Sequence, residues 1–358
     1  MIFQTLYVLV DLFWVGRLGT DAIAAVGLSG NLSFIVIAIT QVLAVGATTV
    51  VSHASGRKDQ ERAIFLFNQS QVLSMVAGIL FLAVAMVLRH QYAATQSSTE
   101  GMRIATEEYL LWFIPAMALQ FAMVAMAAAL RGTGNFKPGM WVQTGTVVIN
   151  IILAPFLIFG WGPFPEMGVS GAALATFLAI VVGIVWISIY FIDAKAYLRF
   201  HFASWAPQLR VWWDMLKIGL PAGAEFALMG IYMAVVYAIT KPFGAAAQGG
   251  FTIGLRVVQS CFLPVVALGF AVAPVAGQNF AARKGERVRG AFKAAAGLSA
   301  AAMLIMSIVI WVAATPIMGI FTIEADVTAY GVEYLRIVVL NFVASGITFV
   351  SSSMFQAM

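Results

Sequence analysis

The sequence predicts an all-α membrane protein whose chain crosses a bilayer about ten times. Hydrophobic residues make up 62% of the 358 residues and charged residues only 10%, whereas a soluble domain is typically about 45–50% apolar and about 25% charged. The apolar segments are about twenty residues or longer, which is the length of a membrane helix. A transmembrane barrel would instead show alternating segments of about ten residues.

Apolar segments that are long enough, or nearly so, to span a membrane follow one another along the whole chain. They lie near residues 1–16, 31–52, 63–88, 108–130, 138–160, 167–192, 216–240, 248–275, 291–320 and 331–358. Polar or turn-forming residues separate each segment from the next. We therefore expect a multi-pass protein that is embedded in the lipid bilayer.

The first segment carries a single carboxylate, Asp11, in an otherwise apolar run. At the centre of a membrane helix such a group costs roughly 2.5–3.5 kcal/mol on insertion scales. No Lys or Arg lies within one helical turn to offset this cost. Carboxylates of this kind usually face a bundle interior or a watery cavity and mark an ion or substrate path. Asp11 is therefore a candidate coupling residue, and the alternative is a solvated Asp at the helix end.

The basic residues alternate between the two sides of the predicted membrane. The gaps after the second, fourth, sixth and eighth segments hold 14 of the 20 Lys and Arg residues, and the gaps on the other side hold 5. The positive-inside rule places the first set in the cytoplasm. We therefore expect a protein of the cytoplasmic (inner) membrane. We expect no nucleic-acid partner, because the basic residues sit in short loops.

The longest connection, residues 193–215, is basic and aromatic. Its amphipathic pattern after Pro207 predicts an interfacial helix at the cytoplasmic side of the membrane. This linker would join an N-lobe bundle of about six helices, residues 1–192, to a C-lobe bundle of about four helices, residues 216–358.

Similarity between the two halves predicts a duplication. Segments 18–27, 52–63 and 108–110 resemble segments 243–250, 278–289 and 333–335. All lie at an offset of about 225 residues, and the matched loops fall on the same side, which predicts a pseudo-two-fold axis along the membrane normal. The same offset predicts that roughly seven to ten residues are missing before Met1 and that two helices should follow Met358. We expect a chain truncated at both ends.

No enzyme or cofactor signature occurs in the sequence. A G-x-x-x-x-G-K-[ST] loop is absent, so ATP is not expected to supply the energy. His53, His90 and His201 lie apart without metal-ligand spacing, and a lone cysteine, Cys261, makes no internal disulfide. We expect no enzyme activity, no metal site and no resident cofactor.

Five longer motifs follow in order over essentially the whole chain. They are DLFWVGRLGTDAIAAVGL, ALRGTGNFKPG, NIILAPFLIFGWGPFPEMGVSGAALAT, IGLPAGAEF and APVAGQNFAARKGERVR. Together they resemble the multidrug and toxic compound extrusion (MATE) family of transporters. The resemblance implies a 12-helix fold of two six-helix lobes, of which about ten helices are present here. It also implies that cation influx drives the export of amphipathic organic, often cationic, small molecules.

The resemblance also implies a cation site. In the family's proton-coupled prokaryotic branch, an Asp on the first helix, an N-x-x-x-D pair on the fifth and a Thr on the sixth form the N-lobe site. These match Asp11, Asn150 and Thr176, but the second Asp is replaced by Ala154, on the same helix face as Asn150. The implied site keeps its geometry and lacks one carboxylate. For Asn150 and Thr176, a role in helix packing is the alternative.

Glu225 is a second acidic candidate, and it follows Pro221 on the seventh segment. Another branch of the family uses a glutamate on this helix and an aspartate on the tenth, where the nearest position here is Ser345. Glu225 would act as a proton site or substrate contact. The alternative is a structural partner for Arg256 or a solvated residue.

The expected function is that of a secondary active exporter, acting as a monomer, that exchanges an inward cation for an outward amphipathic organic cation. Proton coupling is preferred to sodium coupling, because an isolated carboxylate changes charge by titration whereas sodium usually requires several oxygen ligands. Two alternatives stay open. One is a lipid-linked oligosaccharide flippase of the same superfamily, which would use a strongly cationic cavity, and the other is a non-transporting membrane scaffold.

We predict that the loops at Arg57, Lys195 and Arg283 face the cytoplasm, because they carry most of the basic residues. In intact cells, a membrane-impermeant maleimide should leave cysteines introduced in these loops unlabelled. A cysteine beside Arg89, on the opposite predicted side, should react. Ready labelling of the three loops would reverse the orientation.

Overall fold

The computed structural model describes residues 14–15, 18, 20–97, 99–162, 165–192, 196–321 and 324–358. Over these residues most of the backbone is helical and no strand occurs. Eight helical segments in this part of the chain are long and apolar enough to cross a membrane. The predicted all-α polytopic fold is confirmed.

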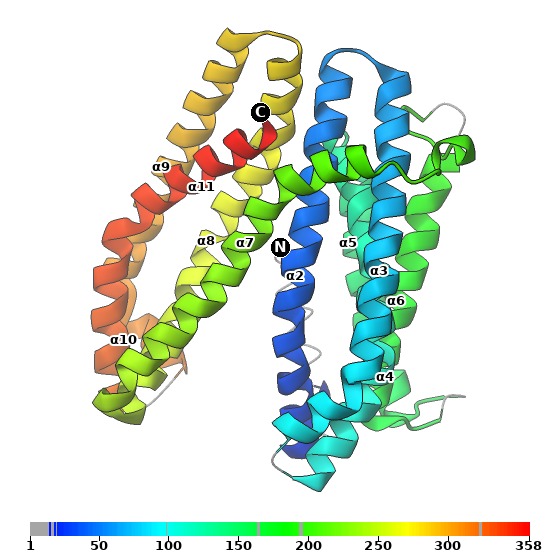
Figure 1. Cartoon of the computed structure of the whole chain (residues 1–358). Helices are drawn as coiled ribbons and strands as arrows, with labels where there is room; N and C mark the ends of the chain where they lie inside the picture. Colours follow the sequence, from blue (N-terminus) through cyan, green and yellow to red (C-terminus); the bar gives the residue numbers. More distant parts are fainter. Residues whose placement is uncertain are drawn as a thin grey trace. The chain divides into compact units, whose positions relative to one another are not determined.

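The chain divides into two compact units, Met1–Ala227 and Leu228–Met358, whose helices are coloured along the sequence in Figure 1. Unit 1 contains α2 (Thr20–Gly56), α3 (Gln60–Gln96), α4 (Glu100–Gly132), α5 (Lys137–Phe159), α6 (Gly168–Ile192), the 3-10 turn η1 (Phe202–Ser204) and the first part of α7 (Leu209–Thr240). Unit 2 contains the rest of α7, η2 (Lys241–Phe243), α8 (Gly244–Ala281), α9 (Gly285–Phe321), α10 (Ala325–Val338), η3 (Val339–Asn341) and α11 (Phe342–Ala357). The nine predicted segments from 31–52 to 331–358 each contain a helix. The predicted division into residues 1–192, 193–215 and 216–358 stays a prediction.

Helix α4 is the centre of unit 1, where it contacts α2, α3, α5 and α6. Its second half contains four small buried side chains, Ala125, Ala127, Ala128 and Ala129. Small residues allow the backbones of membrane helices to approach closely. One contact shows this directly: the Thr48 hydroxyl of α2 donates a hydrogen bond to the Ala128 carbonyl oxygen of α4 at 3.0 Å.

Unit 2 repeats helix boundaries of unit 1 at one constant offset. Helices α3 and α9 both have 37 residues. The starts of α3 and α9 are separated by a certain number of residues. The same number separates the starts of α4 and α10, and also the ends of α4 and α11. The predicted duplication is therefore visible in where the helices start and stop.

The α2–α3 and α8–α9 turns close with the same hydrogen bonds. The Lys58 amide donates to the Ser55 carbonyl and the Asp59 amide to the Ala54 carbonyl, both at 3.0 Å, and the same two bonds recur at the repeat-related positions of the α8–α9 turn. This is a Schellman cap, whose left-handed position usually holds glycine. Here Lys58 and Arg283 occupy it, with φ of 61° and 57°. Basic side chains at these positions complement the negative helix end and supply the positive loop charge.

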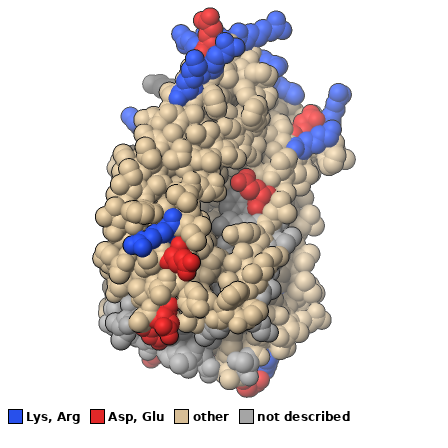
Figure 2. All heavy atoms as spheres, turned by 90° about the vertical axis from the view of Figure 1, so that its left-hand side faces the viewer, with Lys and Arg blue, Asp and Glu red and all other residues tan. Residues whose placement is uncertain are grey.

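The surface of unit 2 has the charge pattern of a membrane protein. Figure 2 faces this unit and shows a surface that is mostly without charged side chains along its length. Lys and Arg side chains gather at the upper end of the view, where the α8–α9 turn lies in Figure 1. This turn and the start of α9 carry Arg283, Lys284, Arg287 and Arg289.

The segment predicted as one helix near 331–358 is interrupted by η3. The Ser307 hydroxyl of α9 donates a hydrogen bond to the Val339 carbonyl oxygen at 2.9 Å, which gives this carbonyl a partner outside its own helix. The repeat pairs Leu340 of η3 with Pro115, which lies inside α4. Proline removes a helix hydrogen bond, but α4 remains helical throughout Glu100–Gly132, so the interruption by η3 occurs in unit 2 and not at the matching position of unit 1. The sequence did not indicate the break in unit 2, because it contains no proline there.

The described part of the predicted interfacial linker, residues 196–215, is α-helical only from Leu209 onward, and its place at the membrane interface stays a prediction. Residues 196–208 contain only the short turn η1, and the residues after Pro207 form the first turns of α7. The reason lies in two fully buried amides of α3, Asn68 and Gln69. They bind the backbone of the linker, so a helical hydrogen-bond ladder is not needed there.

Each of these two amides makes four hydrogen bonds, which is the full capacity of the group. Asn68 donates to the carbonyls of Ile64 and Arg199 and accepts from the His201 amide and the Trp205 indole, at 2.8–3.0 Å. Gln69 contacts the next stretch of the linker in the same way. It donates to the carbonyls of Ser204 and Ala206 and accepts from the Gln208 amide and the Trp212 indole, at 2.6–3.1 Å.

Helices α5 and α6 approach each other closely at two glycines of α6. A Cβ atom at Gly171 would overlap the Leu157 carbonyl group of α5, and one at Gly183 would overlap the Thr146 side chain. Glycine is required at both positions because the neighbouring helix occupies the space of a side chain.

We predict that Gly171→Ala lowers the free energy of unfolding by about 1–3 kcal/mol, because the added methyl group meets backbone that cannot move aside easily. The measurement is the midpoint of thermal unfolding in detergent. Gly297→Ala is the matched control, because nothing lies within 4 Å of a Cβ at that position. Equal midpoints for both variants would show that α5 and α6 are not closely packed.

We also predict that Asn68→Leu with Gln69→Leu releases the linker. In the double variant, two indoles and five backbone groups of the linker would lose their hydrogen-bond partners. Each buried donor or acceptor left without a partner costs about 1–3 kcal/mol. Trypsin should then cut after Arg199 and Arg210 much faster than in the parent protein. Gln71→Leu is the control, because the Gln71 amide donates only to its neighbour Ser70; unchanged cleavage of the double variant would contradict the role of the two amides.

Candidate functional site

The buried pair Asn150 and Thr176 lies between the two close contacts of α5 and α6. The Asn150 side chain is 2% exposed and that of Thr176 6%. The Asn150 Nδ2 atom donates a hydrogen bond to the Thr176 Oγ1 atom at 2.9 Å. The Thr176 hydroxyl lies 3.3 Å from the carbonyl oxygen of Ala172, one turn earlier on α6. The structure thus brings together two of the predicted site residues.

Ala154 lies one helical turn after Asn150 and is also buried. The expected shared face of α5 is therefore present, with a methyl group where the family motif has a carboxylate. The Asn150 and Thr176 side chains are neutral and polar. They offer oxygen atoms and an amide, and neither titrates near neutral pH. Any charge at this site has to come from another residue.

Asp11, the predicted source of that charge, lies outside the described residues. Trp14 of the same predicted segment is described, and its ring packs edge-on against Phe159 and Trp161, with centroids 5.9 Å apart in both cases. Phe159 is the last residue of α5. The end of the first segment therefore contacts the end of the helix that carries Asn150.

The second acidic candidate, Glu225, is exposed on α7 in unit 1. Arg256, its alternative partner, is exposed on α8 in unit 2. The pairing of these two residues stays a prediction. Ser345, at the position where the second branch of the family has an acid, lies on α11 and is half-buried.

The predicted site did not include the buried amides of α3, although the sequence contains a signal for them. Asn68 and Gln69 open the polar run N-Q-S-Q in an apolar segment, and all four side chains are buried. Polar side chains in a membrane helix usually have partners inside the protein. The polar run 68–71 therefore predicts buried hydrogen bonds, but it does not show that the linker is the partner of these side chains.

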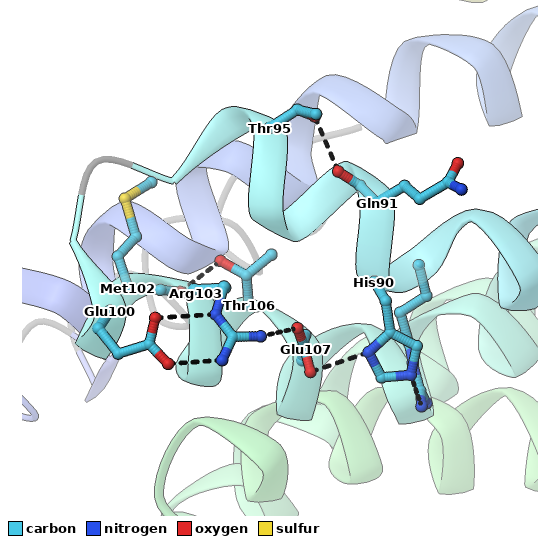
Figure 3. Close-up of polar contacts among 9 residues, drawn as sticks. His90, Gln91, Thr95, Glu100, Met102, Arg103, Thr106 and Glu107 are labelled. Atoms are coloured by element: carbon cyan, nitrogen blue, oxygen red, sulfur yellow. Dashed lines mark hydrogen bonds and ion pairs between the residues drawn. The ribbon is translucent and has the colours of Figure 1, made fainter.

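A charged network that was also not predicted joins α3 to α4 (Figure 3). Arg103 donates to both carboxylate oxygens of Glu100, at 2.9 and 2.5 Å, and to Glu107 at 2.6 Å. The other oxygen of Glu107 lies 3.0 Å from the Nδ1 atom of His90. The Nε2 atom of His90 lies 3.0 Å from an Arg89 nitrogen. Arginine only donates, so Nε2 accepts and the Nδ1 proton points to Glu107.

The sequence signal for this network was the spacing of Glu100, Arg103 and Glu107, which places oppositely charged side chains on one helix face. The pairs lie at the α3–α4 turn, where His90 and Glu100 are exposed and Glu107 is partly buried. Exposed ion pairs typically contribute about 0–1 kcal/mol, so the network orders the turn rather than forming a buried site. Among the described residues, no three His, Cys, Asp or Glu side chains lie close enough to share a metal ion.

Comparison with known proteins gives the family. The MatE family model matches residues 1–156 and 221–358. The probable multidrug resistance protein YoeA of Bacillus subtilis (strain 168) is 25% identical over 351 residues, which cover 96% of this chain and 75% of the relative. The multidrug export protein MepA of Staphylococcus aureus (strain MSSA476) is 26% identical over 358 residues, with 99% and 78% covered.

Solved structures share the fold. An outward-facing multidrug resistance MATE family transporter of the MOP superfamily matches with a TM-score of 0.91 and 24% identity, over 100% of this chain and 79% of the other. A MOP superfamily transporter from Pyrococcus furiosus matches with a TM-score of 0.90, the same identity and the same coverage. Because the family model matches most of the residues, this chain belongs to the MatE family of multidrug and toxic compound extrusion transporters.

Proposed function

We propose that this transporter is a secondary active exporter of the cytoplasmic membrane, which exchanges inward-moving protons for outward-moving amphipathic organic cations. The observation that carries the proposal is the family match, which includes the segments of Asp11, Asn150 and Glu225. The relatives YoeA and MepA are named as multidrug resistance and multidrug export proteins. The proposed working form is a monomer.

Asp11 supplies the charge in this proposal, and Asn150 and Thr176 supply hydrogen bonds beside it. The carboxylate takes up a proton from the outer side and releases it to the cytoplasm. A cationic substrate bound near the ionised carboxylate competes with the proton, and this competition links the two movements. Because Ala154 replaces the second acid, no relay between two carboxylates exists in this lobe.

Protons fit this residue set better than sodium. Sodium requires several oxygen ligands, and the Thr176 oxygen already accepts the Asn150 amide proton. A single carboxylate, in contrast, needs only to gain and lose a proton. The flippase alternative would require a strongly cationic cavity, whereas the two singled-out acids, Asp11 and Glu225, outnumber the one basic residue, Arg256.

We predict that Asp11→Asn abolishes coupled export, because it keeps the shape of the side chain and removes its titration. The measurements are substrate efflux and substrate-induced proton release in proteoliposomes. Asn150→Ala should weaken export less, since Ala154 shows that this lobe tolerates one missing ligand. Insertion and folding of each variant are checked by its thermal unfolding midpoint.

Glu225→Gln is the comparison for the other acid. If Asp11→Asn exports normally while Glu225→Gln is inactive, the coupling site lies around Glu225 and the assignment to Asp11 is wrong. If the wild type transports no organic cation but moves a lipid-linked oligosaccharide, the flippase alternative replaces the proposal.

A further inference from the structure

The outer side of the linker presents large apolar side chains to the surroundings. Phe202 is 76% exposed, Leu209 74% and Trp213 53%. They lie close together in sequence, in η1 and the first turns of α7. We call these three residues the linker surface. All three come from one short stretch of the chain, and exposed apolar patches mark protein or membrane interaction sites more often than ordinary protein surface.

The linker surface is held in place from the inside. Asn68 and Gln69 bind the backbone and the indoles of Trp205 and Trp212, as described above. Phe200 packs against Phe67 and Phe191, with ring centroids 5.5 Å apart in both cases. Because the inner side chains are fixed in the core of unit 1, the side chains of the linker surface are held outward. The surface is therefore ordered before any partner binds.

Basic side chains surround the linker surface. Arg199, Arg210 and Lys217 are exposed, and the Lys217 ammonium lies 5.4 Å from the centroid of the Trp213 ring. The α2–α3 turn lies beside the linker, because the Gln60 side chain donates to the Tyr197 carbonyl at 3.1 Å. That turn adds Arg57, Lys58 and Arg62, against the acids Asp59, Glu61 and Asp214 in the same region. The local charge is therefore positive.

The linker surface lies near one end of unit 1, close to where lipid headgroups are expected. In Figure 1 the linker runs across unit 1 toward the end that carries the α2–α3 turn, and α2 and α3 extend beyond it. Aromatic side chains prefer the boundary between hydrocarbon and water. Lys and Arg beside them are attracted to anionic lipid headgroups, and the attraction falls off within a Debye length.

We propose that the linker surface binds anionic phospholipids of the cytoplasmic leaflet. The apolar side chains enter the boundary between headgroups and acyl chains, and Arg199, Arg210 and Lys217 bind the phosphate groups. The family model matches residues 1–156 and 221–358, so the linker lies outside both matched ranges. The surface would then anchor the connection between the two units to the membrane and make transport sensitive to lipid charge.

The test uses the whole protein in phosphatidylcholine nanodiscs that contain a small fraction of brominated lipid, either phosphatidylglycerol or phosphatidylcholine. Bromine quenches tryptophan fluorescence at short range. The chain has 9 tryptophans, so the signal of Trp213 is the difference between the parent protein and Trp213→Phe. We expect brominated phosphatidylglycerol to quench this signal at a mole fraction at least about tenfold lower, since each basic residue contributes about fivefold.

The variant Arg199→Gln, Arg210→Gln, Lys217→Gln should lose this preference, and added salt should weaken it in the parent protein. The matched control removes three charges from the other basic turn, as Arg283→Gln, Lys284→Gln and Arg287→Gln, and should keep the preference. Equal quenching by both lipids in the parent protein would overturn the proposal. Loss of the preference in the control would also overturn it, because net charge rather than the linker would then attract the lipid. If neither lipid quenches Trp213, the surface lies outside the bilayer and the proposal is wrong.

Discussion

Lipid offers no hydrogen bonds, so polar groups of a membrane-spanning chain need partners inside the protein. This constraint explains the least regular parts of the structure. The linker has little helix of its own, yet five of its carbonyls and amides are paired, because Asn68 and Gln69 provide partners from α3. The same constraint accounts for the bond between Asn150 and Thr176, two polar side chains buried where the helices are closest.

The duplication preserves backbone geometry more closely than side-chain chemistry. The same turn bonds occur after α2 and after α8, and one constant offset relates the helix boundaries of the two units. The long fourth helix differs between the repeats: α4 is continuous through Pro115, whereas η3 interrupts the corresponding helix of unit 2. Pro115 removes a donor in α4, whereas in unit 2 the Ser307 hydroxyl binds the Val339 carbonyl. The two units therefore share helix boundaries and turn bonds, although they differ at the position of Pro115 and Leu340.

The polar features of unit 1 are not repeated in unit 2. The repeat pairs Asn68 and Gln69 with Lys293 and Ala294. Arg103 of the α3–α4 network corresponds to Thr328. The amides that bind the linker and the network of Figure 3 therefore belong to unit 1 alone among the described residues. The two units share a scaffold, and unit 1 also carries the linker and the candidate cation site.

The sequence by itself determined the fold class, the positions of the spans, the basic turns and the repeat, because hydropathy and turn residues are local properties of the chain. It also placed Asn150 and Ala154 on one face, since helical spacing is regular. Only the tertiary structure decided that Asn150 bonds to Thr176, that η3 interrupts the last segment and that the linker has no α-helix separate from α7. These outcomes depend on partners in other helices: the bonds of Asn68 and Gln69 reach residues 131–143 positions away. No local pattern contains such a partner, so composition and periodicity did not reveal it.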